Sequence, residues 1–127
     1  MIAVSAGMVF RDGKIMLCQR KAGSELGLKW EFPGGKLEPG ERPEEALTRE
    51  LKEELDIETR VTGYFTSRRV NNGRDLLILF FTAEIVSGEP RIVDCADIAW
   101  VDPGRMTEYD LAPSDRSAAE EYLRAMA

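Results

Sequence analysis

The stretch that decides the fold spans residues 30–57 and reads WEFPGGKLEPGERPEEALTRELKEELDI. Its first part is rich in turn residues, because the Gly-Gly pair at 34–35 allows backbone geometry closed to other residues and the Pro-Gly pair at 39–40 is a turn signal. Its second part predicts a helix that begins at Pro43, whose fixed φ is already helical and whose missing N–H would have had no partner there. The stretch therefore predicts a loop that leads into one acidic helix.

The spacing of residues along this helix predicts two faces. Leucines four residues apart form the buried stripe: Leu47, Leu51 and Leu55. At about 100° per residue, a neighbouring face carries three carboxylates: Glu50, Glu53 and Glu54. Like charges at these spacings each cost a helix about 0.2–0.5 kcal/mol, and the pattern leaves both Arg49 and Lys52 outside the acidic arc. Helix stability alone does not explain such a face.

An acidic helix face is most often simply solvated, but the turn-rich loop before this one favours a binding site. Glu41 adds a fourth carboxylate at the helix entrance. Hard oxygen ligands gathered in this way suit Mg²⁺ or Mn²⁺. We therefore expect a divalent metal site beside the helix.

The stretch resembles the Nudix box of hydrolases that act on nucleoside-diphosphate-linked substrates. The matching positions are Gly35, Glu41, Arg49-Glu50-Leu51, Glu53-Glu54 and Ile57. One fixed position differs, since the family has Gly where this chain has Asp56. Gly closes the helix in a left-handed conformation that Asp also tolerates, so we expect a small stability cost and retained activity.

The resemblance implies the Nudix fold of the α/β class. This fold is an α/β/α sandwich with a mixed β-sheet, the box helix on one side and the C-terminal helix on the other. The implied metal ligands are the Gly34 carbonyl, Glu50, Glu53, Glu54 and Asp94. Glu53 is the implied general base, with Asp94 as second choice. Asp94 has an equal alternative reading as an exposed loop aspartate.

Two arginines are also expected to take part in the site. Arg49 is expected to orient the box glutamates rather than to contact the substrate. Arg20 matches an arginine that contacts the substrate phosphates in MutT-type enzymes, although a basic side chain before a loop is most often solvated.

The substrate is indicated by residues outside the box. Residues 30–36 resemble MutT-type nucleotide-sanitising enzymes, and residues 109–115 resemble bacterial CTP pyrophosphohydrolases of that subgroup. The resemblance implies Mg²⁺-dependent conversion of a nucleoside triphosphate to monophosphate and pyrophosphate, acting on cytidine or oxidised guanine nucleotides (8-oxo-dGTP) to cleanse the nucleotide pool. Asp115 is expected to read the base, because an ionised carboxylate accepts hydrogen bonds from a cytosine amino group or a guanine edge. The alternative is an aspartate in the first turn of a helix, where the helix dipole favours it.

Two other functions stay open at this point. One is hydrolysis of ADP-ribose or a dinucleoside polyphosphate, although no proline lies between Pro43 and Pro90, where many ADP-ribose hydrolases have one. The other is a non-catalytic Nudix module that senses a nucleotide. A sensor would be expected to lose box glutamates, which this chain keeps.

Composition excludes several classes of function. The chain of 127 residues is long enough for one domain, 1–127, with a real core. Its net charge of −6 argues against non-specific nucleic-acid binding, and the absence of histidine removes imidazole bases and His-ligated zinc. We expect no signal peptide and no membrane segment, hence a cytoplasmic location with buried thiols at both cysteines. Homodimers occur among Nudix enzymes, so a homodimer is compatible with the resemblance.

The remaining elements are predicted from local patterns. Apolar runs at 2–10 and 14–20 around an Asp-Gly pair predict a hairpin. A second hairpin is predicted from residues 58–70 and the apolar run 76–83, around the turn at 71–73. A short strand near 98–101 and a helix from Ser114 to Met126, capped by Ser114, complete the chain.

Some side chains of the second hairpin have two interpretations. Its aromatic residues are either core or base-stacking groups, with core favoured: Tyr64, Phe65, Phe80 and Phe81. Arg68 and Arg69 are weak candidates for phosphate contacts.

Overall fold

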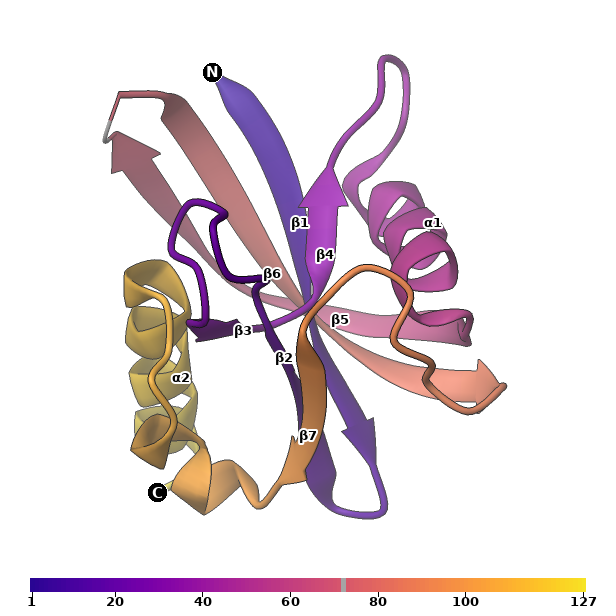
Figure 1. Ribbon diagram of the computed structural model, residues 1–127, viewed down its shortest axis with the longest axis vertical. Helices are drawn as coiled ribbons and strands as arrows, with labels where there is room; N and C mark the ends of the chain where they lie inside the picture. Colours follow the sequence, from indigo (N-terminus) through magenta and orange to yellow (C-terminus); the bar gives the residue numbers. More distant parts are fainter. Residues whose placement is uncertain (72) are drawn as a thin grey trace.

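A twisted sheet lies between two helices in the computed structural model, which describes residues 1–71 and 73–127 (Figure 1). Within the described residues the sheet has seven strands in the order β3-β2-β1-β6-β5, with β4 paired to β1 and β7 paired to β2. The strands are β1 (Ile2–Arg11), β2 (Lys14–Gln19), β3 (Trp30–Glu31), β4 (Gly34–Lys36), β5 (Glu58–Asn71), β6 (Asp75–Ser87) and β7 (Asp97–Val101). Because β1 and β6 run parallel and the other pairs run antiparallel, the sheet is mixed, as predicted.

The helices cover opposite faces of this sheet. They are α1 (Pro43–Leu55) and α2 (Pro113–Met126), and the 3₁₀ helix η1 (Pro103–Glu108) leads into α2. The leucine stripe of α1 is fully buried against one face. Ala118 and Ala119 of α2 are fully buried against the other. The predicted α/β/α sandwich is therefore confirmed.

Alternation along the central strands divides the core into two layers. Successive side chains of a strand point to opposite faces, so Met8 of β1 packs under α2 while Val9 packs under α1. In β6, Phe80 likewise packs under α2 and Phe81 packs under α1. This explains why these runs are apolar at nearly every position, as a strand covered on both faces should be.

Both predicted hairpins are present. β1 and β2 are joined by Asp12 and Gly13, which both have positive φ, at 52° and 77°. β5 and β6 pair over nearly their whole length, further than the predicted strands. The turn predicted at 71–73 includes Asn72, which lies outside the described residues.

The end of α1 has the predicted geometry, whereas the start of α2 was predicted one residue away from where it lies. Asp56 closes α1 with φ 57° and ψ 40°, the left-handed geometry expected at the position where the family has Gly. The predicted cap at Ser114 is wrong, because α2 begins at Pro113 and Ala112 is its cap residue. Proline is suited to the first helical position for the same reason as Pro43 in α1.

Side chains of the second hairpin are mostly structural. Phe80 and Phe81 are buried and Phe65 packs against the α2 layer, whereas Tyr64 is 58% exposed. The guanidinium of Arg68 binds Glu121 of α2 at 2.7 Å, and that of Arg69 binds Asp75 at 2.8 Å. Neither arginine lines the pocket described below.

Among the described residues, none of the helices combines the length and the hydrophobicity that crossing a bilayer requires.

Candidate active site

The two glycines of the box loop let the backbone come close to its neighbours. Gly34 pairs with Ala6 and Gly35 with Ser5 where β4 meets β1. A Cβ atom at Gly34 would overlap the Ser5 carbonyl, and one at Gly35 would overlap the Glu50 carboxyl group. Neither glycine has a positive φ, so close approach, rather than the special backbone geometry predicted from sequence, requires Gly here.

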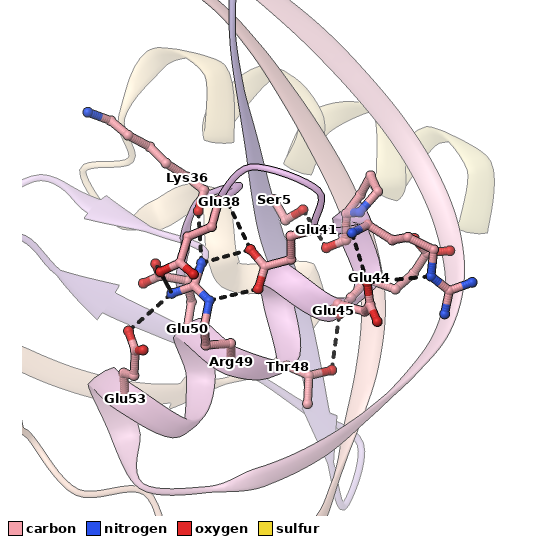
Figure 2. Close-up of polar contacts among 12 residues, drawn as sticks. Ser5, Lys36, Glu38, Glu41, Glu44, Glu45, Thr48, Arg49, Glu50 and Glu53 are labelled. Atoms are coloured by element: carbon pink, nitrogen blue, oxygen red, sulfur yellow. Dashed lines mark hydrogen bonds and ion pairs between the residues drawn. The ribbon is translucent and has the colours of Figure 1, made fainter.

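Arg49 lies at the centre of the acidic cluster (Figure 2). Its Nε and Nη2 bind the two oxygens of Glu41 at 2.8 and 3.0 Å, and Nη2 also donates to the Lys36 carbonyl at 3.0 Å. Its Nη1 lies 2.9 Å from Glu50 Oε1 and 3.2 Å from Glu53 Oε2. The two-pronged ion pair with Arg49 lowers the pKa of Glu41 to about 2, with the Glu38 N–H contributing.

These contacts correct the expectation that nothing offsets the repulsion on the acidic face. Arg49 starts outside the arc, but its long side chain bends over it and holds Glu50 and Glu53 on one nitrogen. The orienting role expected of Arg49 stays a prediction. Lys52 stays outside the arc and pairs with Asp56 and Glu58.

Within the acidic cluster, Glu54 has the pKa that is shifted furthest from its ordinary value. Burial and the charge of Glu50 raise the pKa of Glu54 to about 9, and Glu31 and Asp94 add to the effect. Asp94 stands on the loop before β7, where it pairs with Lys21 at 2.9 Å. The Val93 N–H donates to the Glu54 carbonyl at 3.2 Å, which ties this loop to the end of α1.

Cations of the protein engage three of the expected metal ligands. Arg49 binds Glu50 and Glu53, and Lys21 binds Asp94. Across residues 1–71 and 73–127, no three acidic or thiol side chains converge closely enough to hold one ion between them.

A pocket of about 320 Å³ opens beside this cluster. It lies between β1, β4 and the first turn of α2, and its wall includes Arg20, Glu31, Gly35 and Asp115. Gly35 lines the pocket and lies against the carboxyl group of Glu50. The pocket and the acidic cluster therefore adjoin at Gly35.

The polar groups in this pocket are organised by Arg20 and by a backbone donor. The Arg20 guanidinium binds Glu31 at 2.9 Å and the Glu25 carbonyl at 2.7 Å. Asp115 is 8% exposed and accepts a hydrogen bond from the Phe32 N–H at 3.0 Å. Burial raises the pKa of Asp115 to about 7, against the opposing effect of that N–H.

The family model for the NUDIX domain matches residues 1–123. The chain belongs to the Nudix family. It is 39% identical over 124 residues to the CTP pyrophosphohydrolase of Escherichia coli, covering 97% of this chain and 92% of that one. It is 33% identical over 125 residues to the 8-oxo-dGTP diphosphatase of the same organism, covering 97% of each chain.

Solved structures of Nudix proteins have the same fold. The Escherichia coli ORF135 protein superimposes with a TM-score of 0.85 at 36% identity, covering 100% of this chain and 91% of that one. A MutT Nudix hydrolase from Burkholderia pseudomallei gives a TM-score of 0.85 at 27% identity, covering 94% of this chain and 95% of that one. The chain is thus a Nudix hydrolase, an enzyme class that generally needs a divalent metal.

The donor chemistry of the acidic cluster in this Nudix hydrolase suits a divalent cation. Its donors are carboxylate oxygens, the ligands that Mg²⁺ and Mn²⁺ prefer. The raised pKa of Glu54 reflects burial beside like charges, and a nearby cation would favour the ionised form of such a carboxylate.

Reasoning from the sequence missed two side chains of this Nudix site. Glu31 pairs with Arg20, and burial raises its pKa despite that pairing. Its signal was the alternation in Trp-Glu-Phe, which places one acid between two apolar residues. Lys21 pairs with Asp94, and this pairing joins segments more than 70 residues apart, which local patterns do not reveal.

Asp115 should make the stability of the fold depend on pH. Its pKa is about 7 in the folded state against an ordinary value of 3.8, so between these values the folded chain keeps a proton that the unfolded chain has lost. Stability is therefore expected to fall as pH rises through this window, by up to roughly 1.4 kcal/mol per pH unit. Asp115→Asn, which keeps the acceptor for Phe32, should flatten this slope. The free energy of unfolding in urea, measured at several pH values, checks it.

Glu120→Gln is the matched control for this pH experiment, because Glu120 is an exposed carboxylate on the same helix. Glu31 and Arg20 are the charged groups that act on Asp115 and are left intact in both variants. Parallel pH profiles for the wild type and Asp115→Asn would contradict the assigned shift.

Proposed function

We propose that this Nudix hydrolase is a Mg²⁺-dependent pyrophosphohydrolase of nucleoside triphosphates. It would convert a triphosphate and water to a nucleoside monophosphate and pyrophosphate. Its proposed substrates are cytidine or oxidised guanine nucleotides, so that its role is to cleanse the nucleotide pool.

One observation carries this proposal: a pocket lined by a buried carboxylate that can contact a nucleobase adjoins the acidic cluster that can hold a metal. Asp115 lies in the wall of the 320 Å³ pocket, and Gly35, in the same wall, lies against the carboxyl group of Glu50. The names of the two Escherichia coli relatives, a CTP pyrophosphohydrolase and an 8-oxo-dGTP diphosphatase, support the same substrates.

The proposed metal is Mg²⁺, with Mn²⁺ as an alternative. The residues that would hold it are the Gly34 carbonyl, Glu50, Glu53 and Glu54, with Asp94 as a further ligand. When bound, it would neutralise charge on the phosphates and lower the pKa of a coordinated water.

The protein side chains would position the substrate and move one proton. Glu53 is proposed to take the proton of the attacking water, because it is the most exposed carboxylate held by Arg49 within the box helix. Asp94 is the second choice. Arg49 would fix the orientation of the Glu53 carboxylate, and Arg20, on the pocket wall, would bind phosphate oxygens.

Asp115 is proposed to read the base. One of its oxygens accepts the Phe32 N–H, and its side chain lines the pocket. The ionised form suits the amino group of cytosine, which needs an acceptor. A pKa of about 7 makes the protonated form accessible too, and that form can donate to a carbonyl oxygen of guanine.

Asp115→Ala is expected to change the preference among bases more than the turnover of the best substrate. Loss of a buried polar partner typically alters discrimination by about 1–3 kcal/mol per base contact, or about 5–150-fold. The ratio of kcat/KM for CTP to that for 8-oxo-dGTP measures the effect. An unchanged ratio would remove Asp115 from base recognition.

A substrate panel tests the proposal as a whole. Pyrophosphate release would be followed with Mg²⁺ for CTP, dCTP, 8-oxo-dGTP, dGTP, ADP-ribose and a diadenosine polyphosphate. The same assay with a chelator shows whether turnover needs a metal. The assay with Mn²⁺ in place of Mg²⁺ shows whether Mn²⁺ also supports turnover. We expect a triphosphate to be the best substrate. Preference for ADP-ribose, or binding of a nucleotide without turnover, would overturn the proposal in favour of the other Nudix functions.

Other expectations from the sequence stay predictions. These are the single Nudix domain over residues 1–127, the cytoplasmic location, the lack of nucleic-acid binding and the homodimer.

A further inference from the structure

The loop between β2 and β3 borders the pocket and is held in shape by its own hydrogen bonds (Figure 1). The Arg20 N–H donates to the Lys29 carbonyl at 2.9 Å, and the Leu28 N–H donates to the Arg20 carbonyl at 3.0 Å. Further along the loop, Arg20 Nε donates to the Glu25 carbonyl at 2.7 Å. The arginine of the pocket wall therefore fixes the loop both at its base and at its middle.

Two leucines of this loop share an unusual backbone conformation and a high exposure to solvent. Leu26 has φ 56° and Leu28 has φ 65°, a left-handed region that leucine rarely adopts because its Cβ comes close to a carbonyl oxygen. The exposed fraction is 41% for Leu26 and 52% for Leu28. Of these two leucines, Leu26 lines the pocket and Leu28 does not. Leu28 is therefore a matched comparison for Leu26.

Leu26 lies at the entrance of the pocket. The exposed fractions of Phe32 and Asp115, which line the same pocket, are only 3% and 8%, so these two residues form its inner end. Glu25 and Arg74 also line the pocket, and their exposed side chains form an ion pair at 3.8 Å. This ion pair joins the loop to the residue before β6 and lies, like Leu26, on the solvent side of the pocket.

The sheet gives the pocket an apolar wall, to which the loop adds one apolar side chain. Val4 of β1 and Ile78 of β6 are paired in the sheet, and both line the pocket. Within residues 21–29, Leu26 is the one apolar residue that lines it. A nucleoside whose base meets Asp115 at the inner end would extend towards Leu26 at the entrance. Contact with the nucleoside would remove the exposed apolar surface of Leu26 from water, which favours binding.

We propose that Leu26 is a substrate-binding residue that packs on the nucleoside part of the nucleotide at the entrance of the pocket. This contact rests on the proposed function, which places the base at Asp115. The two residues have different tasks. Asp115 forms hydrogen bonds with the edge of the base, whereas Leu26 adds apolar contact area that is present in the bound substrate and in the transition state alike. Loss of Leu26 therefore weakens binding and leaves the chemical step unchanged.

The test is steady-state kinetics of Leu26→Asn with the better of CTP and 8-oxo-dGTP. Asparagine removes the apolar side chain and tolerates positive φ. We expect KM to rise about 10-fold, the lower end of what a lost apolar contact in a substrate pocket costs, with kcat unchanged. An unchanged KM, or a fall in kcat alone, would overturn the proposal.

Inhibition by the two products shows which part of the substrate Leu26 contacts. The inhibition constant of the nucleoside monophosphate, CMP or 8-oxo-dGMP to match the substrate, should rise about 10-fold in Leu26→Asn, as KM does. The inhibition constant of inorganic pyrophosphate should stay at the wild-type value. A change for pyrophosphate without one for the monophosphate would overturn the contact with the nucleoside.

Leu28→Asn is the matched control, because it makes the same replacement at a positive φ in the same loop, away from the pocket. Its KM and kcat should match those of the wild type, and an equal rise in KM in both variants would assign the effect to the loop as a whole. Leu26→Met should recover most of the lost affinity. Should Leu26→Asn fail to fold, Leu26→Gly, which also accepts a positive φ, takes its place.

Failure of the inference can be told apart from failure of the proposed function. Wild-type protein that releases no pyrophosphate from any triphosphate would overturn both. A wild type that hydrolyses the triphosphate, together with a Leu26→Asn variant of unchanged KM, would overturn the role of Leu26 alone.

Discussion

Replacing Glu53 with glutamine is expected to lower kcat by about 10²–10⁴-fold, the usual contribution of a positioned general base. Glutamine has the same shape but cannot take a proton from water at neutral pH. The Glu53 side chain is 57% exposed, and among the described residues its one ion pair is with Arg49, so the fold should be unaffected. Steady-state kinetics with the best triphosphate, together with thermal unfolding, measures both effects.

Glu44→Gln is the matched control for Glu53. Glu44 is an exposed carboxylate on the first turn of the same helix and lies outside the Arg49 cluster. The kcat of the Glu44→Gln variant should stay close to that of the wild type. If Glu53→Gln turned over normally, or unfolded, Glu53 would not be the base.

Arg49→Lys should lower kcat by about 10²-fold while KM changes little. A lysine keeps the charge but cannot bind Glu41 with two parallel bonds while it also reaches Glu50 and Glu53. The box carboxylates would then lose their fixed orientation, and small misplacements of this kind can cost about 10²-fold in rate. KM should be preserved because Arg49 does not line the pocket.

Arg42→Lys is the control for Arg49, since Arg42 precedes the same helix and its side chain is 75% exposed. The kcat and the KM of the Arg42→Lys variant should both match those of the wild type. A raised KM with an unchanged kcat in Arg49→Lys would instead make Arg49 a substrate contact.

Much of the fold could be predicted because its signals are local. The Pro43 start, the leucine stripe and the left-handed Asp56 each depend on residues within a few positions, and α1 has the predicted form. The same holds for the β1–β2 hairpin. The parallel pairing of β1 with β6 joins residues more than 70 positions apart, and only the family resemblance implied a mixed sheet.

The site was predicted less completely than the fold. Its contacts depend on how far long side chains extend and on partners that are distant in sequence. Helix angles place Arg49 outside the acidic arc, yet its flexible side chain extends back over the glutamates. Glu31 and Lys21 acquire their roles from Arg20 and Asp94. The error at Ser114 has a simpler origin, since the next residue back, Pro113, is an equally good first helical residue.

The position of bond cleavage is the most direct test that the enzyme releases pyrophosphate from a nucleoside triphosphate. Phosphorus NMR of CTP or 8-oxo-dGTP turned over by the enzyme with Mg²⁺ separates the possible products. We expect nucleoside monophosphate and pyrophosphate in equal amounts from the start of the reaction, with Glu53→Gln giving almost none. Nucleoside diphosphate and orthophosphate would contradict it.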